Sequence, residues 1–232
     1  MIDVIAFDAD DTLWHNESIY FQAKTEFADL YAGNLSSNQV LQQLNDTEIH
    51  NLQYYGYGIK SFSLSMIETA LDIDPERVDA AALQQVLDIA KGMLTAEVLL
   101  LDQVEETIAT LSSDYKLMLI TKGDLFEQDG KINRSGIAHH FQVIEIVSEK
   151  TSQRYKKLLA KYSINPQSFL MVGNSMRSDI LPVIEIGGQA VYIPYPDIWE
   201  HEKVNQDYID KNSYYELGDI SQLPDLIEKI ER

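Results

Sequence analysis

The feature that most constrains the fold is a series of short apolar runs spaced along the chain. Between the later runs, apolar residues recur three and four positions apart, which is the spacing of an amphipathic helix. Apolar strands joined by helical crossovers are typical of a parallel sheet that is covered on both faces. The runs are Val4–Phe7, Leu117–Ile120, Val143–Val147, Phe169–Val172 and Ala190–Ile193. The sequence therefore predicts an α/β protein with a parallel sheet.

Residues 16–97 interrupt this alternation of strand and helix. Their apolar positions keep helical spacing throughout, so we predict an all-helical block inserted after the first strand. Helix starts are predicted at Ser36, Asp46 and Asp74-Pro75, because Ser and Asp side chains accept first-turn N–H groups and Pro suits the first helical position. The segment Ile220–Ile230 is predicted to form a last helix that closes the core.

The chain is strongly acidic. It has 18 Lys and Arg residues against 37 Asp and Glu residues, a formal net charge of −19. Such a surface repels polyanions over roughly 10 Å at ordinary ionic strength, and it disfavours an anionic lipid surface. We therefore expect no nucleic-acid partner and no membrane partner, and a monomer or small homo-oligomer.

The chain has no cysteine, which excludes disulfides, thiolate nucleophiles and cysteine-based metal sites. Its first residues carry acids at Asp3 and Asp8, where a secretory signal peptide has a basic stretch and then an unbroken apolar one. The apolar runs are also far shorter than the roughly 20 residues of a membrane helix. We expect a cytoplasmic protein.

Four polar clusters follow directly after apolar runs, at the points where the predicted strands end. In an open parallel sheet the carboxyl ends of the strands share one edge, and ligands bind there. The clusters are Asp8-Ala9-Asp10-Asp11-Thr12, Thr121-Lys122-Gly123-Asp124, Ser148-Glu149-Lys150, and Gly173-Asn174-Ser175 with Asp179. The sequence therefore predicts that four distant segments converge on one crevice.

The order and spacing of these clusters resemble the haloacid dehalogenase-like (HAD) hydrolase superfamily. The resemblance spans the whole chain and rests on Asp8-x-Asp10-x-Thr12, Thr121 after a strand, Lys150 before a helix, and Gly173-Asn174-Ser175-x-x-x-Asp179. It implies a Rossmann-like three-layer core domain made of residues 1–15 and 98–232. Residues 16–97 would then form an α-helical cap domain.

The resemblance also implies a phosphatase that acts on a small phosphorylated metabolite through an aspartyl-phosphate. Asp8 would be the nucleophile, because a carboxylate that attacks phosphorus splits hydrolysis into two easier displacements. Asp10 would protonate the leaving group and later take a proton from water. Thr121 and the main-chain N–H of Lys122 would bind phosphoryl oxygens, while Lys150 would add positive charge.

A divalent cation is expected, because carboxylates and a phosphate that crowd one site repel each other. The resemblance implies Mg²⁺ held by Asp8, the Asp10 main-chain carbonyl, Asn174 and Asp179. Asn174 departs from the family pattern, which usually has an acid after the glycine. An amide oxygen still suits a hard cation, so we expect Mg²⁺ with one ligand charge less. Asp179 would compensate for that charge, would cap the helix near Ile180–Ile186, or would serve both roles.

The helical block is expected to decide the substrate, because a lid excludes water and contacts the leaving group. Its most unusual segment is Tyr54-Tyr55-Gly56-Tyr57-Gly58. The tyrosine rings and hydroxyls would suit a sugar or a base. The alternative is that these rings only pack a cap helix.

Three other functions stay open at this point. A dehalogenase of the same superfamily would use Asp8 on carbon, without a metal and without an acid at Asp10. A phosphomutase would need a bisphosphate cofactor. A catalytically silent binding protein would keep only the fold, and Asn174 is its only support. The presence of Asp8, Asp10, Thr121 and Lys150 favours the phosphatase.

Overall fold

The chain divides into two compact units in a computed structural model that describes residues 1–31, 35–196, 199–204 and 213–232. The first, here called the sheet unit, consists of residues 1–15, 98–122 and 128–232. The second, here called the helical unit, consists of residues 16–97 and 123–127. The predicted α/β fold with a helical insertion after the first strand is confirmed.

Six strands, counted within the described residues, form one parallel sheet in the order β3-β2-β1-β4-β5-β6. In the register of the sheet, Phe7 at the end of β1 lies opposite Leu119 of β2 and Val172 of β4. The strands are β1 (Val4–Phe7), β2 (Lys116–Lys122), β3 (Val143–Val147), β4 (Phe169–Gly173), β5 (Gln189–Tyr192) and β6 (Tyr215–Glu216). This alignment brings the carboxyl ends of β1, β2 and β4 to one edge, as the sequence predicts.

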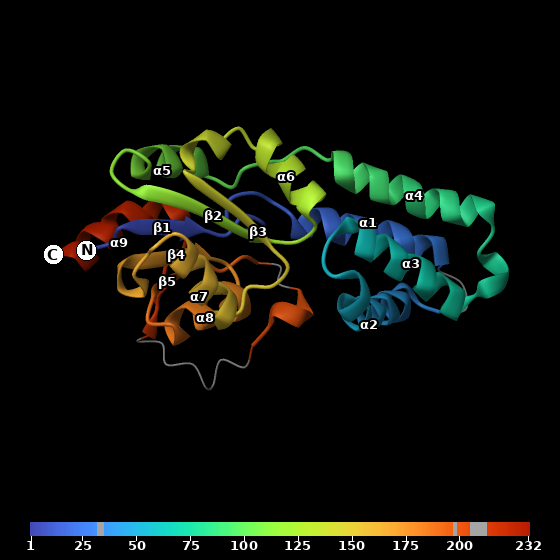
Figure 1. Cartoon of the computed structure of the whole chain (residues 1–232). Helices are drawn as coiled ribbons and strands as arrows, with labels where there is room; N and C mark the ends of the chain where they lie inside the picture. The colour runs from blue at the N-terminus through green and yellow to red at the C-terminus, as the bar shows by residue number, and fades with distance from the viewer. Residues whose placement is uncertain (32–34, 197–198, 205–212) are drawn as a thin grey trace. The chain divides into compact units, whose positions relative to one another are not determined.

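Side chains alternate between two cores, one on each face of the sheet. Ile5 and Phe7 belong to the core that includes α5 and α9, whereas Val4 and Ala6 belong to the core that includes α7 and α8. Figure 1 shows these helices on opposite faces. The helices of the sheet unit are α5 (Val104–Leu111), α7 (Ser152–Lys161), α8 (Leu181–Glu185) and α9 (Leu223–Glu231), and α6 (Leu125–Arg134) starts in the helical unit and continues into the sheet unit. The core is therefore a three-layer sandwich, and the predicted last helix is confirmed.

Short helical turns connect several of these elements. They are η1 (Pro75–Arg77), η2 (Ala138–His140), η3 (Pro166–Ser168), η4 (Met176–Ile180), η5 (Glu200–Glu202) and η8 (Ile220–Gln222). All are 3-10 turns except η4, which is π-helical. The η4 turn follows β4 directly, and π-helical turns are frequent at functional sites.

Among its described residues, the helical unit packs four helices around its own apolar core. The helices are α1 (Glu17–Tyr31), α2 (Ser37–Tyr55), α3 (Ile59–Ile73) and α4 (Ala80–Thr95). Phe27, Leu44, Phe62, Met66 and Val86 are buried in that core. Burial of one face of each helix supplies most of the stability of such a bundle.

Of the helix starts predicted in this unit, some are confirmed and one is wrong. Ser36 begins α2 with a reciprocal capping box that includes Gln39, which confirms that prediction. The start at Asp46 is wrong, because α2 continues through it and buries Leu44 and Asn51 on either side. Pro75 begins the η1 turn, and Asp79 caps α4 by accepting the N–H of Ala82 at 2.9 Å.

Residues 123–127 follow β2 and are tied to the start of α3. A carboxylate oxygen of Glu127 accepts the N–H of Ile59 at 2.8 Å, and Lys60 pairs with Asp124 at 2.8 Å. Gly58 has a φ of 111°, and a Cβ there would lie 2.8 Å from Glu127 Oε2. Position 58 therefore requires glycine, both for its backbone conformation and for this close approach.

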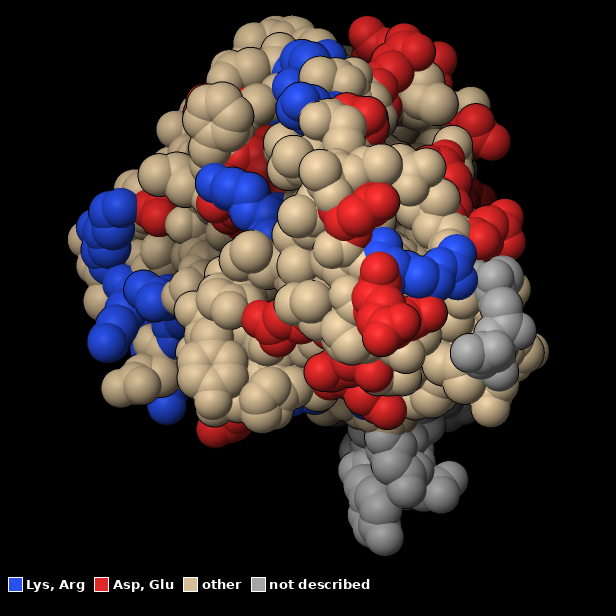
Figure 2. All heavy atoms as spheres, turned by 90° about the vertical axis from the view of Figure 1, so that its right-hand side faces the viewer, with Lys and Arg blue, Asp and Glu red and all other residues tan. Residues whose placement is uncertain are grey.

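The surface agrees with the acidic composition. On the face that Figure 2 shows, acidic side chains spread over wide parts of the described surface, whereas basic side chains lie in separate groups. Among the described residues, no helix has the length and apolar character needed to span a bilayer.

Candidate active site

Asp8 and Lys150 lie together at the carboxyl edge of the sheet. Asp8 follows β1, and its N–H donates to the carbonyl of Val172 in β4 at 2.9 Å. Its side chain pairs with the ammonium of Lys150, which also binds Asp179 Oδ1 at 2.7 Å. Asp8 is 7% exposed, Lys150 4% and Asp179 0%. The structure thus brings together three predicted site residues from three separate segments of the chain.

The charges of this cluster do not balance, because two carboxylates share one ammonium. Burial raises the pKa of Asp8 to about 7; the carboxylates of Asp179 and Asp10 add to this rise, while Lys150 opposes it. Burial alone would lower the pKa of Lys150, but the carboxylates of Asp179 and Asp8 raise it above its usual value. Lys150 is therefore an ammonium at neutral pH, and ionised Asp8 needs further positive charge.

Asp179 is held by the backbone of the loop after β4. Its Oδ2 accepts the N–H of Ser175 at 3.0 Å. A Cβ at Gly173 would lie 2.3 Å from the same oxygen, so only glycine leaves room for it. Ser175, whose hydroxyl accepts the N–H of Ser178 at 3.0 Å, is the residue that caps η4. The alternative role of Asp179 as a helix cap is therefore wrong, and its carboxylate instead fixes Lys150 to this loop.

Asn174 and Asp8 both lie next to the hydroxyl of Thr12. Thr12 Oγ1 is 3.3 Å from Asp8 Oδ2 and 3.2 Å from Asn174 Oδ1. One hydroxyl has one proton, so it can donate to only one of these two oxygens at a time. The arrangement places a carboxylate oxygen and an amide oxygen on the same side of the site.

Asp10 is held by four hydrogen bonds from three side chains. Lys131 Nζ lies 2.8 Å from each carboxylate oxygen, Gln128 Nε2 is 2.8 Å from Oδ2, and Trp14 Nε1 is 2.7 Å from Oδ1. Gln128 Oε1 also accepts the hydroxyl proton of buried Thr121 at 3.3 Å. Asp10 and Thr121 are thereby joined through one amide.

Gln128 and Lys131 are site residues that sequence reasoning missed. They lie three positions apart on α6 and so share one face of that helix. The spacing alone could have suggested a polar helix face. Only the tertiary structure shows that this face meets Asp10.

The side chain of Lys122 forms an ion pair with Glu202. Lys122 Nζ lies 2.5 Å from Glu202 Oε1, and Glu202 Oε2 accepts the hydroxyls of Ser175 and Ser178 at 2.5 and 2.7 Å. Burial alone would raise the pKa of Glu202, but Lys122 and the two serines lower it to about 2. Glu202 was not predicted as a site residue, because the short η5 turn gives no sequence signal of its contact with the η4 turn.

We expect Glu202→Gln to lower the free energy of unfolding at pH 7 by about 3 kcal/mol, because one pKa unit corresponds to roughly 1.4 kcal/mol. The pKa of Glu202 lies below its ordinary value of 4.5. Its contribution is therefore complete above that pH and is lost as the pH falls toward 2. Urea unfolding of wild type and variant across pH measures this difference. Glu97→Gln, at an exposed position, should change little at any pH; an equal effect of both substitutions would contradict the buried network.

The oxygen ligands at this edge suit Mg²⁺ better than a softer metal. Within the described residues, no group of three or more His, Cys, Asp and Glu side chains is arranged to hold an ion. Mg²⁺ usually needs only one or two carboxylates and keeps several waters or substrate oxygens. Of the ligands predicted from the sequence, Asp8, the amide oxygen of Asn174 and the main-chain carbonyl of Asp10 would supply such a set. The unbalanced charge of the Asp8 and Asp179 pair also fits a bound cation.

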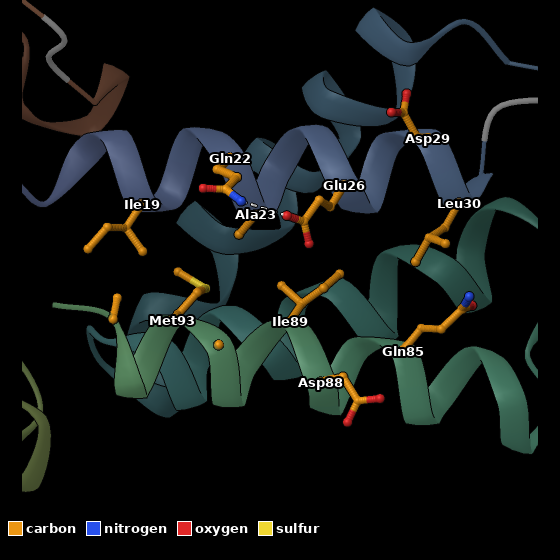
Figure 3. Close-up of a pocket in the computed structure, with 12 residues that line it drawn as sticks. Ile19, Gln22, Ala23, Glu26, Asp29, Leu30, Gln85, Asp88, Ile89 and Met93 are labelled. Atoms are coloured by element: carbon orange, nitrogen blue, oxygen red, sulfur yellow. Dashed lines mark hydrogen bonds between the residues drawn. The ribbon is translucent and has the colours of Figure 1, made fainter.

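A hollow of about 640 Å³ lies within the helical unit between α1 and α4. Figure 3 shows apolar side chains of both helices pointing toward one another across it, among them Ile19, Leu30, Ile89 and Met93. None of its twelve lining residues belongs to the predicted site. The candidate active site is therefore the polar cluster at the edge of the sheet.

The fold is a parallel α/β sandwich with a helical insertion after its first strand. Carboxylates and a lysine lie at the carboxyl edge of its sheet. Together these features define a HAD-type hydrolase. Comparison with known families agrees, since residues 2–187 match haloacid dehalogenase-like hydrolases. The chain belongs to the haloacid dehalogenase-like hydrolase family, which confirms the resemblance seen in the sequence.

Three known proteins are similar to this chain. The chain is 30% identical over 158 residues to glyceraldehyde 3-phosphate phosphatase of Methanothermobacter thermautotrophicus, and the match covers 62% of this chain and 68% of that protein. It is 37% identical to a haloacid dehalogenase-like family hydrolase of Xanthomonas campestris, with a TM-score of 0.86 over 98% of this chain and 91% of that one. A magnesium-bound HAD hydrolase of Bacillus subtilis shares the fold at 16% identity, with a TM-score of 0.70 over 98% and 99% of the two chains.

Proposed function

We propose that this protein is a Mg²⁺-dependent phosphatase that hydrolyses a small phosphorylated metabolite through an aspartyl-phosphate. The observation that carries the proposal is the buried carboxylate of Asp8, which lies against Lys150 at the end of β1, with Asp10 two residues further on. The phosphatase named among its relatives supports the same chemistry. In this proposal the sheet unit is the catalytic core domain and the helical unit is its cap domain.

In the first step, a carboxylate oxygen of Asp8 forms a bond to phosphorus while the bond from phosphorus to the ester oxygen breaks. Asp10 gives its proton to that oxygen, which leaves as an alcohol. Lys150 and the hydroxyl of Thr121, with nearby main-chain N–H groups such as that of Lys122, neutralise and orient the phosphoryl oxygens.

In the second step, Asp10 takes a proton from a water molecule whose oxygen bonds to phosphorus. The bond between phosphorus and Asp8 breaks, which releases inorganic phosphate and restores the Asp8 carboxylate. Asp8, Asn174 and the carbonyl of Asp10 would hold Mg²⁺, with Asp179 nearby to add negative charge. When bound, the ion supplies positive charge that stabilises the transferring phosphoryl group.

The experiment that tests this function measures phosphate release from a panel of small phosphate esters, beginning with glyceraldehyde 3-phosphate and other three-carbon esters. We expect release with Mg²⁺ and a loss of at least about a hundredfold with a chelator. The same preparation is given 2-haloacids and assayed for halide. Halide release without phosphate release would establish the dehalogenase instead, and neither product from any substrate would favour the silent binding protein. Release of phosphate only with an added bisphosphate would indicate a mutase.

The assignment of Asn174 as a metal ligand makes a separate prediction. Asn174→Asp adds one negative charge to the ligand set, and ligand charge tunes the affinity of such sites. We expect the variant to bind Mg²⁺ roughly tenfold more tightly, as measured by calorimetric titration. Asn165→Asp is a matched control, because that exposed residue caps the turn before β4, at the opposite end of the strand. An unchanged titration of Asn174→Asp would remove Asn174 from the ligand set.

A further inference from the structure

The carboxylate of Asp10 is held more rigidly than a solvent-facing acid needs to be. Each of its oxygens accepts two hydrogen bonds: Oδ1 from Trp14 and Lys131, and Oδ2 from Gln128 and Lys131. Donors on both oxygens fix the plane of the carboxylate as well as its position. The Asp10 side chain nevertheless stays one-fifth exposed, and the proton that makes Asp10 an acid takes the place of one of these donors on the oxygen that faces the substrate.

The donors themselves are buried and leave little freedom of movement. Lys131 is 7% exposed, Gln128 2% and Trp14 1%. Burying a lysine ammonium is costly unless it is well paired, and the contacts of Lys131 with both oxygens of Asp10 provide that pairing. Gln128 continues the network to Thr121 and to the main-chain carbonyl of Lys122, at 3.3 Å each.

We propose that Lys131, assisted by Gln128, is a positioning residue that aims the carboxyl group of Asp10 at the leaving group of the substrate. This inference rests on the proposed phosphatase function, in which Asp10 protonates the departing oxygen. Proton transfer requires the acid to lie within hydrogen-bond distance of its acceptor, and errors of about 1 Å in such positions can cost roughly a hundredfold in rate. The network gives the α6 helix a part in the reaction that acts through Asp10.

The leaving group provides a readout that a merely structural role would not change. An alkyl phosphate must have its departing alkoxide protonated, whereas p-nitrophenolate leaves readily without a proton. Loss of a correctly aimed acid therefore slows hydrolysis of an alkyl phosphate far more than hydrolysis of p-nitrophenyl phosphate. General structural damage, by contrast, slows both substrates alike.

The test compares kcat/KM for these two substrates in wild type, Lys131→Met and Lys131→Arg. We expect Lys131→Met to lose about a hundredfold on the alkyl phosphate and less than about fivefold on p-nitrophenyl phosphate. Lys131→Arg keeps a charged donor and should recover most of the loss. Lys161→Met is the control, because it breaks a lysine–carboxylate pair with Glu145 on an exposed helix face; both rates should stay near those of wild type.

Two results would overturn the inference: equal losses on both substrates, or no loss on either. Circular dichroism and thermal unfolding show whether Lys131→Met is folded. If it is not, Gln128→Leu removes the second donor to Asp10 and should give the same selective loss on a smaller scale. If wild type releases phosphate from neither substrate, the proposed phosphatase function itself is contradicted. Failure of the proposed function can thus be distinguished from failure of the positioning role of Lys131.

Discussion

Asp8→Asn is expected to reduce turnover of a phosphate ester by at least about a thousandfold, because an amide cannot attack phosphorus and removal of a nucleophile costs at least this much in comparable enzymes. Its fold should remain intact, since Lys150 keeps Asp179 as a partner at 2.7 Å. Phosphate release and thermal unfolding, measured on the same preparation, check both parts.

Asp114→Asn is the matched control for this substitution. Asp114 is exposed and precedes β2, at the amino edge of the sheet, so its replacement should leave turnover unchanged. Persistent turnover by Asp8→Asn, at more than about a tenth of the wild-type rate, would show that another group is the nucleophile. A large drop in thermal stability would show that Asp8 is needed for folding rather than for chemistry alone.

Lys150→Met is expected to have the largest combined effect, with loss of turnover and a decrease of about 3–5 kcal/mol in the free energy of unfolding. The substitution leaves the carboxylates of Asp8 and Asp179 buried without their shared cation. Chemical denaturation at pH 7 measures the decrease. Lys156→Met, at an exposed position on the following helix, should cost less than about 0.5 kcal/mol.

A double variant separates loss of this pairing from general loss of packing. Adding Asp179→Asn to Lys150→Met removes one of the two uncompensated charges, so part of the lost stability should return. A double variant whose stability loss equals the sum of the two single losses would show that Lys150 and Asp179 do not stabilise one another. The double variant should not regain turnover, because Lys150 is also proposed to neutralise the phosphoryl group.

The buried strands could be predicted from the sequence because each is a short apolar run bounded by polar residues. β1 and β3 begin and end at the predicted residues. β6 was not predicted, because Tyr215–Glu216 is a two-residue exposed edge strand without an apolar run. Asp46 resembled a helix start but lies inside α2, where packing of Leu44 into the core of the helical unit overrides the local preference.

The meeting of Asp8, Lys150 and Asp179 could also be predicted, because all three follow strands whose carboxyl ends share an edge. The contacts of Gln128 and Lys131 with Asp10 could not be predicted. These two residues lie on a helix, and the direction in which a helix face points depends on tertiary packing. Glu202 lies in a short turn after β5 and accepts hydrogen bonds from Ser175 and Ser178. No sequence motif predicts these contacts.

The aspartyl-phosphate mechanism is tested most directly by Asp10→Asn with p-nitrophenyl phosphate and Mg²⁺. This leaving group needs no proton, so Asp8 should still be phosphorylated, whereas water attack should be slow without the Asp10 base. We expect a burst of one p-nitrophenolate per enzyme, followed by slow turnover. One phosphoryl group on Asp8 should be found by mass spectrometry after acid quench. Steady hydrolysis by wild type with no burst and no phosphorylated Asp8 in Asp10→Asn would contradict the aspartyl-phosphate mechanism.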